Sequence, residues 1–273
     1  MRLPTFFGVH ASPPRWLGRV LALAPFVVLI AIYFAASHTR LAENPDDKIL
    51  PSFEQMASAV DRLAFTRDAR SGEFVMLQDT LSSLKRLALG IALAAFVGLM
   101  LGMNMALFPG MGLTLIGVVT FVSIIPPLAV LPILFITFGV DEAAKVMLIF
   151  LGTFALITRD IYGTVKAMPQ EQLTKALTLG ASQLQLVYRI VLPQIVPRLI
   201  DTVRLSLGGG WLFLIAAEAI ASTDGLGYRI FLVRRYLAMD VIIPYVLWIT
   251  LLGFTIDWSL RRIVRSRYRW YAS

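Results

Sequence analysis

The sequence predicts an all-α integral membrane protein with about six transmembrane helices. Of its 273 residues, 58% are hydrophobic and only 15% are charged, whereas soluble globular chains are closer to half apolar and a quarter charged. Apolar runs long enough to cross a bilayer recur along the chain, and Lys and Arg gather at their ends. Basic clusters of this kind are typical of the flanks that orient a membrane protein.

The same composition argues against several functions. The chain has no cysteine, which excludes disulfides, thiolate metal sites and cysteine nucleophiles. Its two histidines, His10 and His38, have no partner at metal-ligand spacing, so we expect no metal site. The net charge is +8, but no basic stripe is interleaved with aromatic residues, and we expect no nucleic-acid partner.

The first apolar run, Val20 to Ala36, predicts the first membrane helix, with Arg15 and Arg19 before it. The alternative is a cleaved signal peptide, because FAAS at the end of the run resembles a small-residue cleavage site. The run is longer than the apolar core of a signal peptide, which has about 7 to 15 residues. A retained helix is therefore the favoured interpretation.

Residues 87–140 contain no Asp, Glu, Lys or Arg. At about 1.5 Å per residue, a single helix over this range would be roughly 80 Å long, enough for two crossings of a bilayer core. Proline and glycine in FPGMG (108–112) interrupt the pattern. We therefore expect helix two over 87–107 and helix three over 112–138.

Three further apolar runs predict helices four to six, over 143–158, 205–222 and 241–260. Six crossings place both termini on the same side of the membrane. More than half of the 25 Lys and Arg residues lie in segments that are cytoplasmic when the termini are inside, including RRIVRSRYRW after the last helix. Both termini are therefore expected in the cytoplasm.

This count predicts three parts. They are a cytoplasmic N-terminus over 1–19, a six-helix membrane domain over 20–260 and a basic cytoplasmic tail over 261–273. Within the membrane domain we expect a periplasmic segment over 37–86 and the largest cytoplasmic loop over 159–204.

The large cytoplasmic loop is polar and basic although its flanks are apolar. PQEQLTKALTLG (169–180) predicts a helix that stops at Gly180. SQLQLVYRIVL (182–192) predicts a second helix, capped by Ser182 and ending before Pro193. Two short amphipathic helices joined at a glycine make a compact knob outside the membrane. The alternative is a pair of helices that lie on the lipid surface.

Gly180, followed after nine residues by Ile-Val-Leu-Pro, resembles the EAA loop of ABC-importer permeases. The family pattern is EAA, three residues, Gly, nine residues and I-x-L-P, and this loop is the coupling helix that docks into a groove on the ATPase subunit. The chain retains five residues of the pattern: Ala176, Gly180, Ile190, Leu192 and Pro193.

The chain departs from the pattern at two positions of the EAA triplet. Thr174 stands where the family has Glu, and Lys175 stands at the first Ala. One expected polar contact with the ATPase is therefore missing. Glu171 lies one helical turn earlier and is the candidate replacement.

Further stretches that resemble the family follow in the family order, at 50–63, 80–94, 125–145, 214–230 and 251–262. They are similar to the NitT/TauT branch, which imports nitrate, sulfonates, taurine and similar small solutes. The resemblance implies a type I importer permease with a MetI-like fold in the bacterial cell inner membrane. It also implies a homodimer bound to two ATP-binding cassette ATPase subunits and to a periplasmic or lipid-anchored solute-binding protein.

The chain has no G-x-x-x-x-G-K-[ST] phosphate loop. We therefore expect a transport subunit without enzymatic activity, which binds no cofactor itself, while ATP and Mg²⁺ are used by the partner ATPase. The similar-looking SLGGG at 206–210 is interpreted as a site of close helix packing.

Helix three contains Pro126, Pro127 and Pro132. Each proline removes a backbone donor, and lipid-exposed helix tolerates the freed carbonyl poorly. One interpretation is a simple kink packed against a neighbour. The other is a break that lines the translocation pathway and moves during alternating access.

Glu218 is an acidic residue well inside an apolar run, and a charge at membrane depth is functional by default. The alternatives are a position near the outer interface, paired with a basic residue such as Arg229, or a link between subunits. Adjacent Arg159 and Asp160 are interpreted as an inner ion pair or gate.

The cargo is expected to be small, either similar to nitrate, sulfonates or taurine, or a urea- or guanidine-related compound. A stand-alone secondary transporter or channel is the main alternative, but it would need coupling-ion residues on several helices or an inverted repeat. An intramembrane enzyme would need clustered His, Asp, Glu or Ser, which the apolar runs do not contain.

Overall fold

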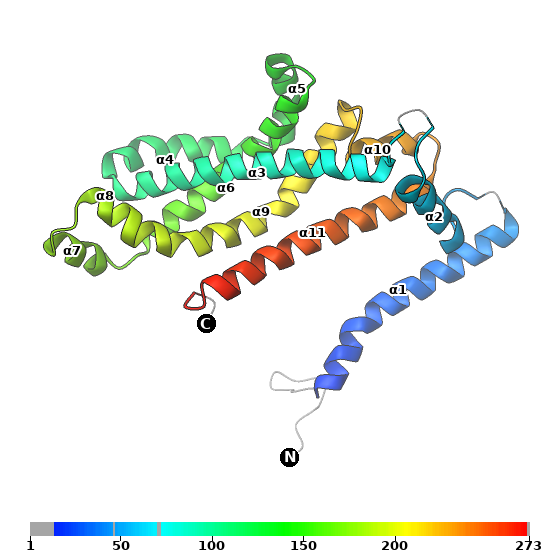
Figure 1. The fold of residues 1–273 in the computed structure, drawn as a ribbon, viewed down its shortest axis with the longest axis horizontal. Coiled ribbons are helices and arrows are strands. Elements are labelled where there is room, and N and C mark those ends of the chain that lie inside the picture. Colours follow the sequence, from blue (N-terminus) through cyan, green and yellow to red (C-terminus); the bar gives the residue numbers. More distant parts are fainter. Residues whose placement is uncertain (1–13, 46, 70–71, 272–273) are drawn as a thin grey trace.

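The computed structural model describes residues 14–45, 47–69 and 72–271. His10 and most of the predicted 1–19 segment lie outside these ranges. Over the described residues the chain is helical and contains no strand. Figure 1 shows an elongated bundle in which α3, α6, α9 and α11 run roughly along one another.

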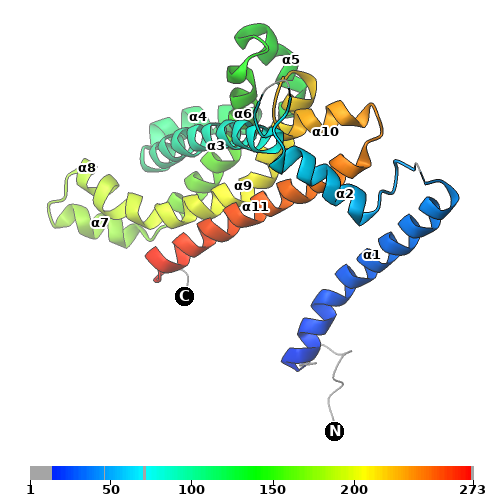
Figure 2. The same cartoon turned by 45° about the vertical axis from the view of Figure 1, so that its right-hand side comes forward.

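Helix α1, Arg15–Glu43, stands apart from this bundle. Both Figure 1 and Figure 2 show it splayed away, joined to the rest through the segment that leads to α2, Phe53–Val60. Its contacts lie near its C-terminal end, where the Tyr33 hydroxyl donates to the carbonyl of Pro51 at 2.7 Å. Only 6% of its most apolar stretch is buried. Most of α1 therefore offers its side chains to lipid or to another protein.

Helices α3, Val75–Leu107, and α6, Glu142–Lys166, pack closely. Glycines on α3 allow this, because a Cβ at Gly98 would lie 2.8 Å from Ile157 Cγ2, and one at Gly102 would lie 2.6 Å from the carbonyl oxygen of Thr158. Small residues at membrane helix contacts let backbones approach in this way.

The predicted third helix is two helices in the structure. Helices α4, Pro109–Ile124, and α5, Pro127–Phe138, meet at 97°. Pro126 is the N-cap of α5 and Pro127 is in its first turn, positions that proline tolerates because no intrahelical donor is needed there. A single helix over 112–138 is therefore wrong, and the proline pair supplies the physical reason. The turn predicted at FPGMG is confirmed, because Phe108 is in an extended conformation between α3 and α4.

The second half of the chain contains the remaining helices. Short α7, Gln170–Thr178, precedes a continuous 38-residue helix, Gln183–Ile220. This helix comprises α8, Gln183–Gln185, a π-helical turn, Leu186–Val191, and α9, Leu192–Ile220. Helix α10, Leu226–Arg234, then leads to α11, Met239–Arg267.

Five described helices are long and apolar enough to cross a membrane, and the bent α4–α5 pair counts as a sixth span. The all-α fold with about six spans is therefore confirmed. The helices run further than predicted: α3 begins at Val75, α6 ends at Lys166, and α11 ends at Arg267. An apolar run ends at the first charged residue, whereas the helix itself continues beyond that residue. The apolar runs therefore underestimate the lengths of these helices.

Candidate functional site

The coupling segment, defined as residues 170–193, begins with α7 and a glycine-terminated turn. Gly180 has φ +87°, and its N–H donates to the carbonyl of Leu177 at 3.0 Å. The N–H of Ala181 reaches back to the carbonyl of Ala176, also at 3.0 Å. This pair of bonds is the Schellman arrangement, which a left-handed glycine terminates most readily. The helix stop predicted at Gly180 is confirmed.

The second helix of the coupling segment starts as predicted but does not end as predicted. The Ser182 hydroxyl accepts from the N–H of Gln185, and the Gln185 side chain accepts from the N–H of Ser182, which forms a capping box. The helix then continues through Pro193 into α9. A π-helical turn immediately precedes Leu192 and Pro193. Its wider register accommodates the proline, which lacks a donor, so the predicted end before Pro193 is wrong.

The coupling segment has an anchored side and an exposed side. Four apolar side chains are buried against α3 and α6, near Met103, Ile161 and Val165: Ala176, Leu186, Val187 and Val191. Of the other seven predicted coupling residues, five are exposed and two are half-buried; the exposed ones are Glu171, Thr174, Lys175, Gly180 and Pro193, and the half-buried ones are Ile190 and Leu192.

Four large apolar side chains project from the exposed side. Their exposed fractions are 50% for Leu177, 81% for Leu179, 69% for Leu184 and 59% for Tyr188. Sequence reasoning did not single out these four side chains as an exposed apolar patch. The available signal was a large apolar residue directly before the helix-stopping glycine, Leu179, and another two positions after the Ser182 cap, Leu184.

Ion pairs fix the N-terminal half of α9 to its neighbours. Arg198 donates to the two carboxylate oxygens of Asp160 on α6, at 2.9 and 2.5 Å, and the Thr202 hydroxyl donates to the same carboxylate at 2.5 Å. Asp160 therefore pairs with Arg198. The interpretation of Arg159 and Asp160 as an ion pair is wrong, because Arg159 instead donates to the Ser123 hydroxyl on α4 at 3.0 Å.

A cavity of about 520 Å³ lies beside the α4–α5 break, and we call it the break cavity. It is lined by side chains from α4, α5, α6 and α9, among them Ser123, Pro127, Arg159 and Phe213. The ring of Phe213 lies over Gly152, where an added Cβ would be 2.2 Å from the ring. Of the three predicted pathway prolines, Pro127 lines this cavity, whereas Pro126 and Pro132 are exposed.

Glu218 lies elsewhere, fully buried near the other end of α9. Arg86 of α3 donates to it at 2.7 Å, the Ser83 hydroxyl at 2.8 Å, and the N–H of Gly227 at 2.8 Å. Its carboxylate also lies against Gly225, where a Cβ would come within 2.5 Å of it. The predicted pairing of Glu218 with Arg229 is wrong, because the Arg229 guanidinium pairs with the Asp79 carboxylate at 2.8 Å.

Arg86 and Asp79 are the buried centres of a larger ionic network that reaches the surface at Glu142. Arg86 also donates to Glu142 at 2.6 Å and to Asp224 at 2.5 Å. Asp79 accepts from the N–H of Gly225 at 2.9 Å and from the Tyr245 hydroxyl at 3.0 Å. The network thus joins α3, α6, α9, α10 and α11, and its members are Asp79, Ser83, Arg86, Glu142, Glu218, Asp224, Arg229 and Tyr245.

The network also holds the connection between α9 and α10. Asp224 lies in that connection, where burial raises the pKa of its carboxyl, but hydrogen bonds from Arg86 and Ser82 outweigh burial and keep the pKa below its usual value. Sequence reasoning missed Asp79 and Arg86. The signal was their spacing with Ser83, since residues at i, i+4 and i+7 share one helix face.

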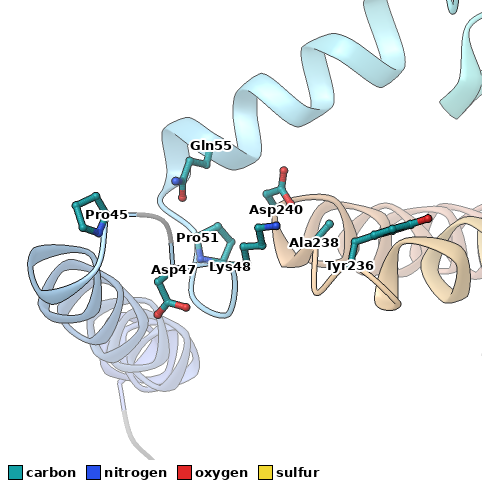
Figure 3. A pocket seen from close by; sticks show the side chains of 8 residues that line it. All are labelled: Pro45, Asp47, Lys48, Pro51, Gln55, Tyr236, Ala238 and Asp240. Carbon is teal, nitrogen blue, oxygen red and sulfur yellow. The ribbon is translucent and has the colours of Figure 1, made fainter.

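A second pocket, of about 680 Å³, lies at the network end of the molecule. Figure 3 shows its lining side chains, which come from the segment between α1 and α2, the first turn of α2, the α10–α11 connection and the first turn of α11. The N–H of Ile49 and the Arg40 guanidinium bind Asp47 here and hold the pKa of its carboxyl below the usual value. Leu237, between two lining residues, has a φ of 56°, which is uncommon for a bulky residue.

Comparison with known proteins matches this architecture to one family. Residues 94–269 match the family described as binding-protein-dependent transport system inner membrane component. The chain is 29% identical to the taurine transport system permease protein TauC of Escherichia coli, over 96% of each chain. It is 33% identical to the putative aliphatic sulfonates transport permease protein SsuC of Escherichia coli, over 54% of this chain and 56% of that one.

The fold is also similar to solved structures. An inward-facing structure of the MetNI methionine ABC transporter matches with a TM-score of 0.61 at 17% identity, over 73% of this chain and 99% of that chain. The MetI-like fold prediction is thereby confirmed. The chain belongs to the binding-protein-dependent transport system inner membrane component family, in its NitT/TauT branch, and is the permease subunit of an ABC importer whose ATP is hydrolysed on a separate subunit.

Proposed function

We propose that the coupling segment is the surface on which the ATPase docks to drive import. The observation that carries this proposal is the exposure of Leu177, Leu179, Leu184 and Tyr188 on a small, well-capped fold. Exposed apolar clusters of this kind mark interaction sites. Glu171 and Lys175 are exposed on the same helix and supply polar contacts at the rim.

Docking force passes from the coupling segment into α9 without an intervening loop, because Gln183–Ile220 is one continuous helix. Asp160 and Asp257 bind this helix to α6 and α11 through Arg198 and Arg204. A tilt of the coupling segment therefore displaces the walls of the break cavity. In this mechanism Pro126, Pro127 and Pro132 allow α5 to move separately from α4 during alternating access.

We propose a complex of two copies of this permease, two ATPase subunits that bind ATP and Mg²⁺, and one solute-binding protein. The exposed surfaces of α1 and α5 support a second copy, since large apolar residues such as Phe26 and Ile136 are 65% and 86% exposed. The chain itself is proposed to bind no cofactor, in keeping with the absence of a phosphate loop from its sequence.

We propose that the coupling segment and both termini face the cytoplasm, and that the network end faces outward. Figure 1 supports this orientation, since the start of α1 and the end of α11 point toward the end that carries α7. The basic residues after Asp257 agree with it. The pocket of Figure 3 is then on the outer face, which a solute-binding protein would contact.

The proposed cargo is a small organic sulfonate or a similar oxyanion, as the names of the taurine and aliphatic sulfonate relatives suggest. The test is reconstitution in proteoliposomes with the partner ATPase and solute-binding protein, with radiolabelled taurine as the probe. Uptake should require both partner proteins. It should also require ATP on the side of the membrane that the ATPase faces. Uptake by the permease alone would instead support a stand-alone transporter or channel.

The binding protein provides an independent measurement of the cargo. Its thermal unfolding should shift upward with sulfonates and not with guanidinium or urea, because ligands stabilise the state that binds them. A shift only with urea or guanidinium would contradict the proposed cargo and leave the coupling proposal untouched.

A further inference from the structure

We propose that the break cavity contains a subsite for the anionic group of the cargo, formed by Arg159 and Ser123. This inference rests on the proposed import function and adds a binding residue within the permease itself. Arg159 lies within the membrane-spanning helix α6, eight positions after the cavity residue Leu151. Its side chain is exposed and lines the cavity, and a charged side chain that faces a cavity of a membrane protein commonly marks a pathway for substrate or ions.

The charge of Arg159 is not neutralised by a neighbour. Among the described residues its guanidinium makes one side-chain hydrogen bond, to the Ser123 hydroxyl at 3.0 Å, and no ion pair. Asp160 also lines the cavity. Its carboxylate, however, is taken up by Arg198 and Thr202, with donor distances of 2.5 to 2.9 Å.

The net result is an exposed guanidinium in the cavity with most of its donors unused. A guanidinium presents paired N–H donors that match a planar or tetrahedral oxyanion. The Ser123 hydroxyl donates to the carbonyl of Thr120 at 2.7 Å and accepts from Arg159, so it holds the guanidinium at the cavity wall. A cationic cargo would be repelled at this point.

The remaining walls suit a small molecule with an apolar part. Pro127, Leu156 and Phe213 provide apolar surface around Arg159. The cavity volume of about 520 Å³ falls within the roughly 300 to 1,000 Å³ of small-molecule pockets. Gly152 keeps this space open on one side, because any side chain there would displace the Phe213 ring.

The test uses the absence of cysteine from the sequence. Leu156, which is 53% exposed and lines the cavity, is replaced in the Leu156→Cys variant. The purified permease–ATPase complex is treated with an anionic reagent, 2-sulfonatoethyl methanethiosulfonate, or with its cationic trimethylammonium counterpart. The ratio of the two labelling rates reports the local electrostatic potential without any transport step.

The anionic reagent should react faster, and adding Arg159→Gln should lower the anionic-to-cationic rate ratio about tenfold. Arg159→Lys should keep most of the preference, since it keeps the charge. Methanesulfonate, but not guanidinium, should slow labelling when Arg159 is present.

Equal rates in the Arg159 background, an unchanged ratio in Arg159→Gln, or no labelling by either reagent would overturn the subsite. Protection by guanidinium instead of methanesulfonate would also overturn it. Labelling requires neither cargo uptake nor ATP, so each of these results can be separated from a failure of the coupling proposal.

Discussion

The two ends of the bundle are built on opposite principles. At the network end, charged groups are buried and satisfied within the chain: Glu218 and Asp79 have no exposed surface, and each accepts three or more hydrogen bonds. At the coupling end, Leu179 and Leu184 project outward with no partner among the described residues. The first end satisfies its charged groups within the chain, whereas the second is the surface that we propose the ATPase covers.

This difference teaches where stability and function should separate. Removing one charge from the network leaves another charge buried without compensation. Changing an exposed apolar side chain of the coupling segment leaves the fold intact and affects only association. Each prediction below tests that separation, and the variants run from the largest expected effect to the smallest.

Arg86→Met should cause the largest loss, because it leaves Glu218 buried without its cation. We expect the free energy of unfolding to fall by about 3 to 5 kcal/mol, or the variant not to accumulate. Thermal unfolding in detergent, followed by intrinsic fluorescence, measures this loss. The control is Arg261→Met, which removes a half-exposed partner of the accessible Asp257 and should cost less than about 1 kcal/mol.

A second variant keeps the Arg86 result interpretable if that protein fails to fold. Combining Arg86→Met with Glu218→Gln removes both charges of the pair and should recover part of the stability. Equal stability of Arg86→Met and the unaltered chain would mean that the network is not a source of rigidity, and the comparison between the two ends would fail.

Leu179→Asp should leave thermal unfolding unchanged but weaken binding of the ATPase. A central apolar contact residue commonly contributes about 2 kcal/mol, which corresponds to roughly thirtyfold in affinity. Binding of purified ATPase to the permease in nanodiscs measures the change. Gln183→Ala, an exposed polar change in the same segment, is the control, and an equal loss in both variants would count against a specific docking surface.

Gly180→Ala should have a smaller, local effect. Its φ of +87° is unfavourable for alanine by about 1 to 2 kcal/mol, so the turn after α7 should open more often and be cut faster by a protease. Gly163→Ala is the matched control, because Gly163 lies within α6 with open space around it. Faster cleavage in both variants, or in neither, would contradict the role assigned to Gly180.

The combined Pro126→Ala and Pro127→Ala variant should have the smallest effect on both ends. Restoring two backbone donors favours a straighter α4–α5 junction, so transport should fall a few-fold while thermal unfolding and ATPase binding stay unchanged. Uptake in proteoliposomes measures transport, and binding of purified ATPase measures docking. Full transport activity would show that the break does not take part in alternating access.

The sequence predicted features that depend on neighbouring residues. Gly180 as a helix stop and Ser182 as a cap follow from local backbone chemistry, and both are confirmed. The turn at Phe108 follows equally from adjacent Pro and Gly. The family was predicted from the order of its motifs and is confirmed by the match over residues 94–269.

Features that depend on distant residues could not be predicted. Glu218 and Arg86 are 132 positions apart, and only the packing of α3 against α9 brings them together. The π-helical turn before Pro193 could not be predicted either. Sequence rules state only that proline lacks a donor and disfavours the interior of a helix, not how a helix can accommodate it. In the same way, no local pattern indicated that Asp160 would pair with Arg198 and leave Arg159 to face the break cavity.

The uninterrupted helix Gln183–Ile220 has a mechanical consequence. With 38 residues and a rise of about 1.5 Å per residue, it is a rod of roughly 57 Å, and a rotation of about 10° around one end would sweep the other end through about 10 Å. Modest motions in a motor subunit are thereby amplified into displacements as large as a small solute, provided that the rod does not bend. Bending at its π-helical turn, a feature at which helices commonly kink, would reduce how much of each stroke reaches the far side.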